Sequence, residues 1–203
     1  MKKAILLLMA VVGLMAANAQ QHVEFKWHRM YGVAGYAFTT NINSLQYSYG
    51  SSDDPQVFND KASIQGIYAV GGWQIRKESG IGLGVEFMKD MSSGYTMLPV
   101  FVEVRSHFLR NQVSPFTSAY VGYAIPLGFS GMGADYVKID QGGATWGLSV
   151  GARYAINRKM GVSAFIGYQG IFLNRVNFYH EGGLEVGEPR LMQNFKLGVG
   201  FNF

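Results

Sequence analysis

The last eleven residues, QNFKLGVGFNF, constrain the fold of this chain more than any other stretch. Side chains in an extended strand alternate between its two faces. One face of this stretch is wholly apolar and consists of Phe195, Leu197, Val199, Phe201 and Phe203. Chain ends usually fray into water, so an apolar strand that ends on an aromatic residue favours the closing strand of a membrane β-barrel, where such a face meets lipid.

The first 19 residues predict a cleaved secretory signal peptide. The basic residues Lys2 and Lys3 precede an apolar run over residues 4–15, which is too short to span a bilayer comfortably. Ala17-Asn18-Ala19 then fits the small-residue pattern of a cleavage site. We therefore expect residues 1–19 to be removed and residues 20–203 to form a single exported domain.

The composition also points to a membrane barrel. Charged residues make up 15% of the chain, against roughly 25% in soluble domains. After the leader, no run approaches the ~18 apolar residues of a membrane helix, and only helices and closed barrels satisfy every backbone group in lipid. The chain has no cysteine, which excludes disulfides and thiolate metal sites. No basic patch indicates nucleic acid as a partner.

Eight strand-like runs follow the leader, and most of them alternate between apolar and polar or small residues. Each is at least about as long as the 9–11 residues that a tilted membrane-spanning strand needs. The runs cover residues 29–40, 63–76, 80–88, 96–108, 115–127, 143–156, 160–173 and 193–203. They predict an all-β fold, namely an eight-stranded antiparallel up-and-down transmembrane β-barrel.

The connections between these runs support the same topology. Three of them, residues 77–79, 109–114 and 157–159, are short, and residues 89–95 form one of moderate length. The other three are long and cover residues 41–62, 128–142 and 174–190. Outer-membrane barrels have short periplasmic turns and longer extracellular loops, so we expect both termini and all three short turns on the periplasmic side.

Glycines decide which face of the strands points inward. A soluble lipocalin-type barrel also has eight strands, but it would point the apolar face inward. Eight glycines share the polar face, and they are Gly82, Gly84, Gly147, Gly151, Gly161, Gly167, Gly198 and Gly200. Glycine weakens a strand that faces water, whereas a narrow lumen needs small residues beside large ones. Aromatic residues near strand ends, including Trp73, Tyr123, Trp146 and Tyr154, are typical of interfacial girdles.

With its leader, the stretches LPVFVEVRSHF (98–108) and SPFTSAYVGYAIPLG (114–128), and the final FNF, the chain resembles the small outer-membrane β-barrel domain family of Gram-negative bacteria, often labelled porin-like. The resemblance implies a location in the bacterial outer membrane, in contact with its lipid and lipopolysaccharide. It also implies that the apolar face of the last strand is the assembly signal that the barrel-assembly machinery recognises. It implies little about activity, because fold does not give function.

Several charged side chains lie on the face opposite lipid. An Arg or Lys in lipid costs about 2–4 kcal/mol at mid-depth, so these side chains are expected in the lumen with Gln169, and opposite charges there should pair. We predict that Glu103, Arg105 and Arg153 cluster in the periplasmic half, with Glu86 and Lys196 nearer mid-depth, and that this cluster plugs the barrel. Arg76 is assigned to the same face.

No catalytic, metal or cofactor site is predicted. Outer-membrane deacylases carry a His and a Ser two positions apart on one strand, but Ser106 directly precedes His107, so these two side chains face opposite ways. His180 beside Glu181 lies in a long connection without a supporting motif, and the loop pairs Asp53-Asp54 and Asp135 with Asp140 match no calcium loop.

Two functions remain open from the sequence. The first is a structural or surface-interaction role that depends on the long loops, which contain tyrosines such as Tyr47, Tyr49 and Tyr136 and would contact a surface ligand. The alternative is a narrow porin-like channel or transporter for ions or small solutes.

Overall fold

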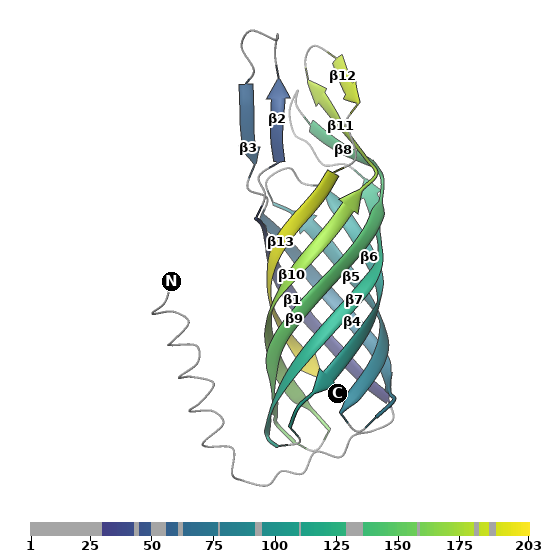
Figure 1. The fold of residues 1–203 in the computed structure, drawn as a ribbon, viewed down its shortest axis with the longest axis vertical. Helices are drawn as coiled ribbons and strands as arrows, with labels where there is room; N and C mark the ends of the chain where they lie inside the picture. The colour runs from purple at the N-terminus through teal and green to yellow at the C-terminus, as the bar shows by residue number, and fades with distance from the viewer. Residues whose placement is uncertain are drawn as a thin grey trace, which may run out of the picture.

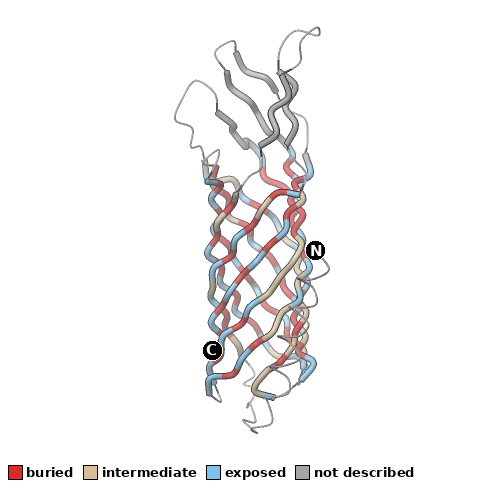
Figure 2. Tube along the Cα trace, turned by 90° about the vertical axis from the view of Figure 1, so that its left-hand side faces the viewer, coloured by how far each residue is buried: buried red, intermediate tan, exposed pale blue. Residues whose placement is uncertain are grey.

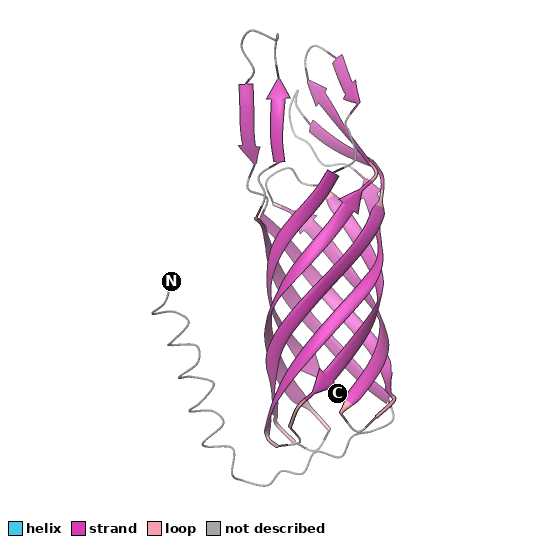
Figure 3. Cartoon of the chain, in the orientation of Figure 1, coloured by secondary structure: helices cyan, strands magenta, loops and turns pink. Residues whose placement is uncertain are grey.

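A computed structural model of the chain describes residues 30–42, 45–49, 56–60, 63–76, 78–91, 95–109, 111–128, 136–157, 159–180, 183–186 and 190–203. The predicted signal peptide, residues 1–19, lies outside the described residues. Within the described part, the chain consists of strands and their connections (Figure 3). None of it forms a helix that is long and apolar enough to cross a membrane.

Eight strands form a closed antiparallel barrel (Figure 1). They are β1 (Met30–Asn41), β4 (Ser63–Gln74), β5 (Ser79–Asp90), β6 (Thr96–His107), β7 (Val113–Gly128), β9 (Gly143–Ala155), β10 (Gly161–Leu173) and β13 (Arg190–Asn202). Each barrel strand pairs with the next barrel strand along the chain, and β1 pairs with β13 to close the barrel. The predicted eight-stranded up-and-down barrel is therefore confirmed.

The barrel has two different ends. At one end, called here the terminus-side end, β1 begins, β13 finishes, and three short connections join β4 to β5, β6 to β7 and β9 to β10 (Figure 1). At the opposite, loop-side end, the chain leaves the barrel in the long connections. This distribution is the one that the alternating connection lengths predict.

The long connections contain strands, which the sequence analysis missed by treating them as loops. β2 (Leu45–Tyr49) and β3 (Gln56–Asp60) pair as a hairpin. β8 (Tyr136–Gln141), β11 (Arg175–His180) and β12 (Gly183–Val186) form a three-stranded sheet in the order β12-β11-β8. Both sheets stand beyond the loop-side end of the barrel (Figure 1).

Burial alternates from residue to residue along most of the barrel strands (Figure 2). Most exposed positions in the middle of the strands are aliphatic, as at Leu83, Val121 and Leu148, although Tyr36 is an exception. Polar residues such as Glu86 and Gln169 occupy buried positions that face the lumen. The apolar side chains therefore point outward, as in a membrane barrel and unlike a soluble one.

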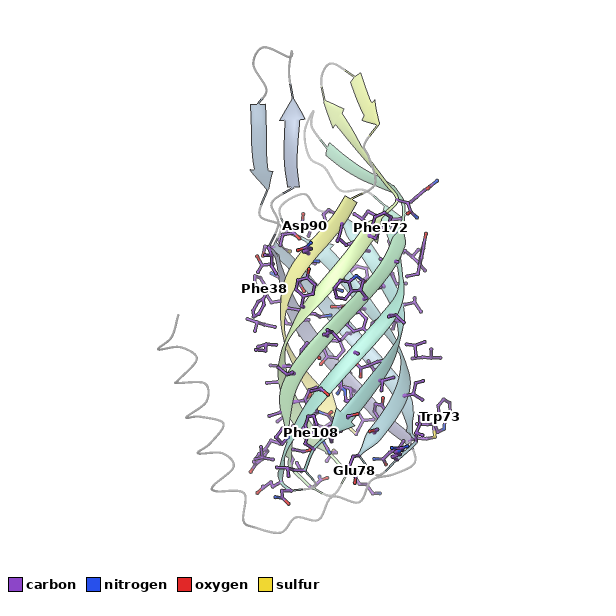
Figure 4. The ribbon with its side chains drawn as sticks, viewed as in Figure 1. Phe38, Trp73, Glu78, Asp90, Phe108 and Phe172 are labelled. Atoms are coloured by element: carbon purple, nitrogen blue, oxygen red, sulfur yellow. The ribbon has the colours of Figure 1, made fainter. Side chains whose placement is uncertain are left out.

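Exposed aromatic residues gather toward both ends of the outer surface. Figure 4 places Phe38 and Phe172 near the loop-side end and Trp73 and Phe108 near the terminus-side end. Aromatic residues in such positions form the girdles that lie at membrane interfaces. The outer surface thus has an aliphatic band between two aromatic belts, which is the pattern that a bilayer requires.

Inside the barrel, glycines leave room for aromatic rings. A Cβ added at Gly84 would overlap the ring of Phe101 on the neighbouring strand β6, and one added at Gly198 would overlap the ring of Phe165. Phe101 and Phe165 belong to one layer of packed side chains that also includes Tyr31, Val33, Ala37, Tyr68, Val70 and Tyr120. The lumen is therefore filled by rings that fit only because their neighbours lack side chains.

Replacing Gly84 with valine should destabilise the barrel by about 1–3 kcal/mol, because overpacking a filled interior forces side chains out of their preferred rotamers. The matched control is Gly71→Val, since a Cβ at Gly71 meets no atom within 4 Å. The measurement is urea unfolding of the refolded barrel in lipid vesicles. Equal stability of the two variants would contradict the close fit between Gly84 and Phe101.

Candidate functional site: the lumen and its terminus-side mouth

The central polar contact of the lumen joins β13 to β5. Lys196 Nζ donates to Glu86 Oε2 at 2.6 Å, and the two side chains are 8% and 0% exposed. β13 and β5 are not neighbours, because β1 and β4 separate them in the barrel. The pair therefore spans the lumen, and Lys196 also lies 5.7 Å from the centre of the Tyr120 ring.

A second ion pair lies toward the terminus-side end. On β6, Arg105 Nε donates to Glu103 Oε1 at 2.9 Å, and its Nη2 donates to Oε2 at 3.3 Å. The guanidinium also lies 4.8 Å from the centre of the Phe116 ring. Arg153 on β9 is 4% exposed and borders the same cavity as Arg105. The structure thus brings Arg105 and Arg153 to one end of the lumen.

Of two other polar residues assigned to the lumen from sequence, Gln169 lies there and Arg76 does not. Gln169 is fully buried on β10, and its Nε2 lies 3.9 Å from Met88 Sδ. Arg76 was assigned wrongly to the lumen. It lies beyond the end of β4, where the chain bends, and it is exposed. The period-two pattern applies only while the chain remains extended, so it fails at Arg76.

Several buried polar atoms near the ion pair at mid-lumen have no hydrogen-bond partner. They include Glu86 Oε1, Tyr120 Oη, Gln169 Oε1 and both amide atoms of Asn194. The side chains of Glu86, Gln169 and Asn194 are all 0% exposed, so the packing leaves no room for water beside them. Each such group costs about 1–3 kcal/mol. Glu86, Gln169 and Asn194 are therefore polar side chains packed without direct access to solvent.

An apolar layer closes the loop-side end of the lumen. It consists of Ile64, Met88, Tyr95, Met97, Ala124, Ile171, Leu173 and Met192, each at most 4% exposed. Tyr95 Oη lies 3.8 Å from Met192 Sδ across the lumen. This layer was not predicted from sequence, because only the charged residues, Gln169 and the glycines were considered as lumen residues. Ile171 and Leu173 continue the face of Gln169 and were the available signal.

His107 lies close to a serine, although it is not the serine considered from sequence. His107 Nδ1 lies 3.3 Å from Ser114 Oγ, and the two residues are 8% and 3% exposed. Ser114 Oγ donates its proton to the carbonyl oxygen of Leu109 at 2.5 Å. A nucleophilic serine must donate to its base instead, so this contact ties the strand end to the turn and does not activate Ser114.

A small cavity of about 40 Å³ opens at the terminus-side mouth of the lumen. Its lining includes the cationic residues Arg105, Arg153 and Lys159, together with Glu78 and Tyr31. This volume exceeds the roughly 10–15 Å³ that one water needs. The described residues contain no group of three or more His, Asp or Glu side chains that could hold a metal ion.

Comparison with solved structures finds barrels of the same kind. Neisserial surface protein A is 15% identical, with a TM-score of 0.55, and the match covers 86% of this chain and 96% of that protein. The outer membrane protein OprG from Pseudomonas aeruginosa is 11% identical, with a TM-score of 0.58 over 90% and 99% of the two chains. The chain therefore shares the fold of small outer-membrane barrels, and the outer-membrane location predicted from sequence agrees with that fold.

No protein-family model matches the chain, and no curated protein matches it in sequence.

The Lys196–Glu86 pair gives a stability prediction. Lys196→Met should destabilise the barrel by roughly 3–5 kcal/mol, because it leaves the Glu86 carboxylate buried without its cation. The double variant Lys196→Met with Glu86→Leu should recover most of that loss, since replacing both members of a buried pair with apolar residues is often neutral. The measurement is urea unfolding of the refolded barrel.

The control is Arg76→Met, which removes an exposed charge and should change stability by about 0.5 kcal/mol or less. If the double variant loses as much stability as the sum of its two single variants, the two side chains are not coupled.

Proposed function

We propose that this protein is a non-enzymatic outer-membrane barrel with a structural or surface-interaction role and a closed lumen. The observation that carries the proposal is the filling of the lumen at successive levels. An apolar layer at the loop-side end is followed by the Lys196–Glu86 pair, a layer of aromatic rings and the Glu103–Arg105 pair. A dry apolar layer obstructs ions because they would lose their hydration there.

The alternative is a narrow channel for ions or small solutes. The polar levels favour this alternative, because Glu86 Oε1 and Gln169 Oε1 lack partners and would gain from a rearrangement that admits water. The apolar layer argues against it, because Met88, Met97 and Met192 are at most 1% exposed. An eight-stranded lumen is only wide enough for its side chains to fill it.

The surface role is supported by the way the barrel continues beyond its loop-side end. β8 leads into β9 and β10 leads into β11, with one intervening residue in each case, and β8 pairs with β11 just as β9 pairs with β10. The Nδ2 of Asn174, between β10 and β11, donates to the carbonyl oxygen of Gly142, between β8 and β9, at 2.9 Å. This bond connects the two points at which the chain leaves the barrel. This continued pairing would hold the projection formed by β8, β11 and β12 at a fixed position over the barrel.

The absence of enzymatic activity is part of the proposal. The His107–Ser114 contact directs the serine proton to a backbone carbonyl. Binding is therefore the activity for which the fold is best suited.

Conductance decides between the closed barrel and the channel. The refolded barrel should be silent in a planar bilayer or give only brief, weak openings, because its lumen is filled. Glu103→Ala and Arg105→Ala should each change those openings, since each removes half of an ion pair near the terminus-side mouth, whereas the exposed control Arg76→Ala should not. A steady wild-type conductance on the nanosiemens scale that neither substitution alters would establish an open lumen.

The surface role is tested by removing the projection. Replacing Tyr136–Gln141 and residues 175–186 with short turns should leave a folded, heat-modifiable barrel, because the barrel ladders lie outside these segments. Cells with this variant should show the same surface defect that deletion of the gene causes. A barrel in which only β2 and β3 are replaced is the matched control. If all the long connections can be shortened without causing the defect that gene deletion causes, the surface proposal fails.

A further inference from the structure

The outer wall of the barrel carries a groove, and the inference drawn from it is independent of whether the lumen conducts. The groove has a volume of about 540 Å³, which falls within the roughly 300–1,000 Å³ of small-molecule sites. Its lining comes from β6, β7, β9, β10 and β13, which follow one another around the barrel (Figure 1). The groove therefore runs across the strands.

Strand register explains the course of the groove. Its two walls are rows of outward-facing residues that register places side by side on successive strands. The row nearer the terminus-side end consists of Ser106, Thr117, Val150 and Ile166. The row nearer the loop-side end consists of Val104, Ala119, Leu148, Tyr168 and Phe195.

The floor of the groove consists of small residues. Ser118, Ser149 and Gly167 also line it, and they belong to the inward-facing row that lies between the two walls. The hydroxyls of Ser118 and Ser149 bond to each other at 2.6 Å. The walls are two residues apart along each strand, which is about 6.4–6.8 Å. A furrow of this width suits a single hydrocarbon chain.

The length and slope of the groove match one leaflet of a bilayer. Four steps between neighbouring strands give a length of about 19 Å. Because membrane strands tilt by about 35–45° from the barrel axis, a groove that crosses them at right angles rises by roughly 11–14 Å. Half of a ~30 Å hydrocarbon core is about 15 Å. The groove rises from Ser106, near the terminus-side end of β6, to Phe195, near the middle of β13.

The surroundings of the groove identify hydrocarbon as what covers it. Val104, Leu148 and Val150 are 48%, 57% and 53% exposed, and they belong to the aliphatic band between the two aromatic belts. Lipid tails are as apolar as leucine, so a chain is held there by close packing and not by expulsion of water. Only a groove that fits a chain gains such packing over the convex wall around it.

The terminus-side end of the groove is polar. Ser106 Oγ lies 2.9 Å from Ser79 Oγ on the neighbouring strand β5. Two hydroxyls carry two protons and their mutual bond uses one, so the other proton can be donated to an oxygen outside the barrel. Arg76, an exposed cation, is joined to Ser79 by two backbone hydrogen bonds. Hydroxyls and a cation at the interface suit the ester and phosphate oxygens of a phospholipid.

We propose that this groove binds one acyl chain of a phospholipid whose headgroup lies at the terminus-side interface. The chain lies between the two walls, from Ser106 to Phe195, and the hydroxyls of Ser79 and Ser106 donate to the oxygens of the headgroup. This lipid is a stoichiometric ligand of the barrel wall, in contrast to the lipids that exchange freely around it.

The test is photolabelling of the refolded barrel in phosphatidylcholine vesicles. The probe is a trace of phosphatidylcholine that carries a diazirine halfway along one acyl chain. The expected result is saturable labelling, up to one lipid per barrel, concentrated on residues 148–150 and 166–168. Outward residues of the opposite wall, such as Ile67 on β4, should be labelled about tenfold less, since tenfold corresponds to the gain of a few close contacts.

Two variants test the two parts of the site. Ala119→Leu fills the groove and should lower labelling of residues 148–150 by about tenfold or more. Its matched control is Ala69→Leu on β4, because Ala69 is also exposed on the outer wall and does not line the groove. Ser106→Ala should lower labelling by about two- to tenfold, the factor that corresponds to one hydrogen bond. Heat-modifiable migration checks that each variant is folded.

Three results would overturn the proposal. The first is equal labelling of all eight strands, which describes freely exchanging lipid. The second is an equal effect of Ala119→Leu and Ala69→Leu. The third is labelling of the groove that falls, with cross-links between barrels, as the protein-to-lipid ratio is raised, because a second copy of the chain then covers the groove.

Discussion

Closure of the barrel between β1 and β13 is the interaction on which the rest of the structure depends. A strand edge in lipid has no water to satisfy its amide and carbonyl groups, and each unsatisfied group costs several kcal/mol. The pairing of Val33 through Asn41 with Asn202 through Asn194 removes both edges at once. The backbone of Phe203 then pairs with Gly32 and extends the closure to the last residue.

Closure with only eight strands sets the width of the lumen, and this width explains what the inward positions contain. Charges cannot face lipid, so they must enter a space that holds little water. Lys196 and Glu86 satisfy this requirement by pairing across the lumen. Rings such as Phe101 fill the remaining volume where Gly84 faces them. The narrow lumen therefore explains why glycine, aromatic and charged residues share the inward face of the strands.

The sequence predicted the barrel well because its main signal, period-two alternation, follows directly from the membrane. The eight barrel strands fall within a few residues of the predicted runs. The alternation of apolar and polar residues breaks down at Ile171, where the inward-facing residue is also apolar. It also breaks down at Arg76, where the chain is no longer extended. It also gave no sign of β8 or β11, because strands that leave the membrane need no apolar face. The approach of Ser114 to His107 depends on cross-strand register, which composition does not encode.

The two ends of the barrel differ in the strands and side chains that surround them. At the loop-side end the β9–β10 ladder continues as β8–β11, with a register shift between Arg175 and Val176. A bulge of this kind increases the local twist of a ladder, so the projection leaves the barrel in a defined direction. At the terminus-side end, a small cavity borders Arg105 and Arg153. If the lumen is closed, as we propose, the projecting surface on one side and the cationic mouth on the other act independently of each other.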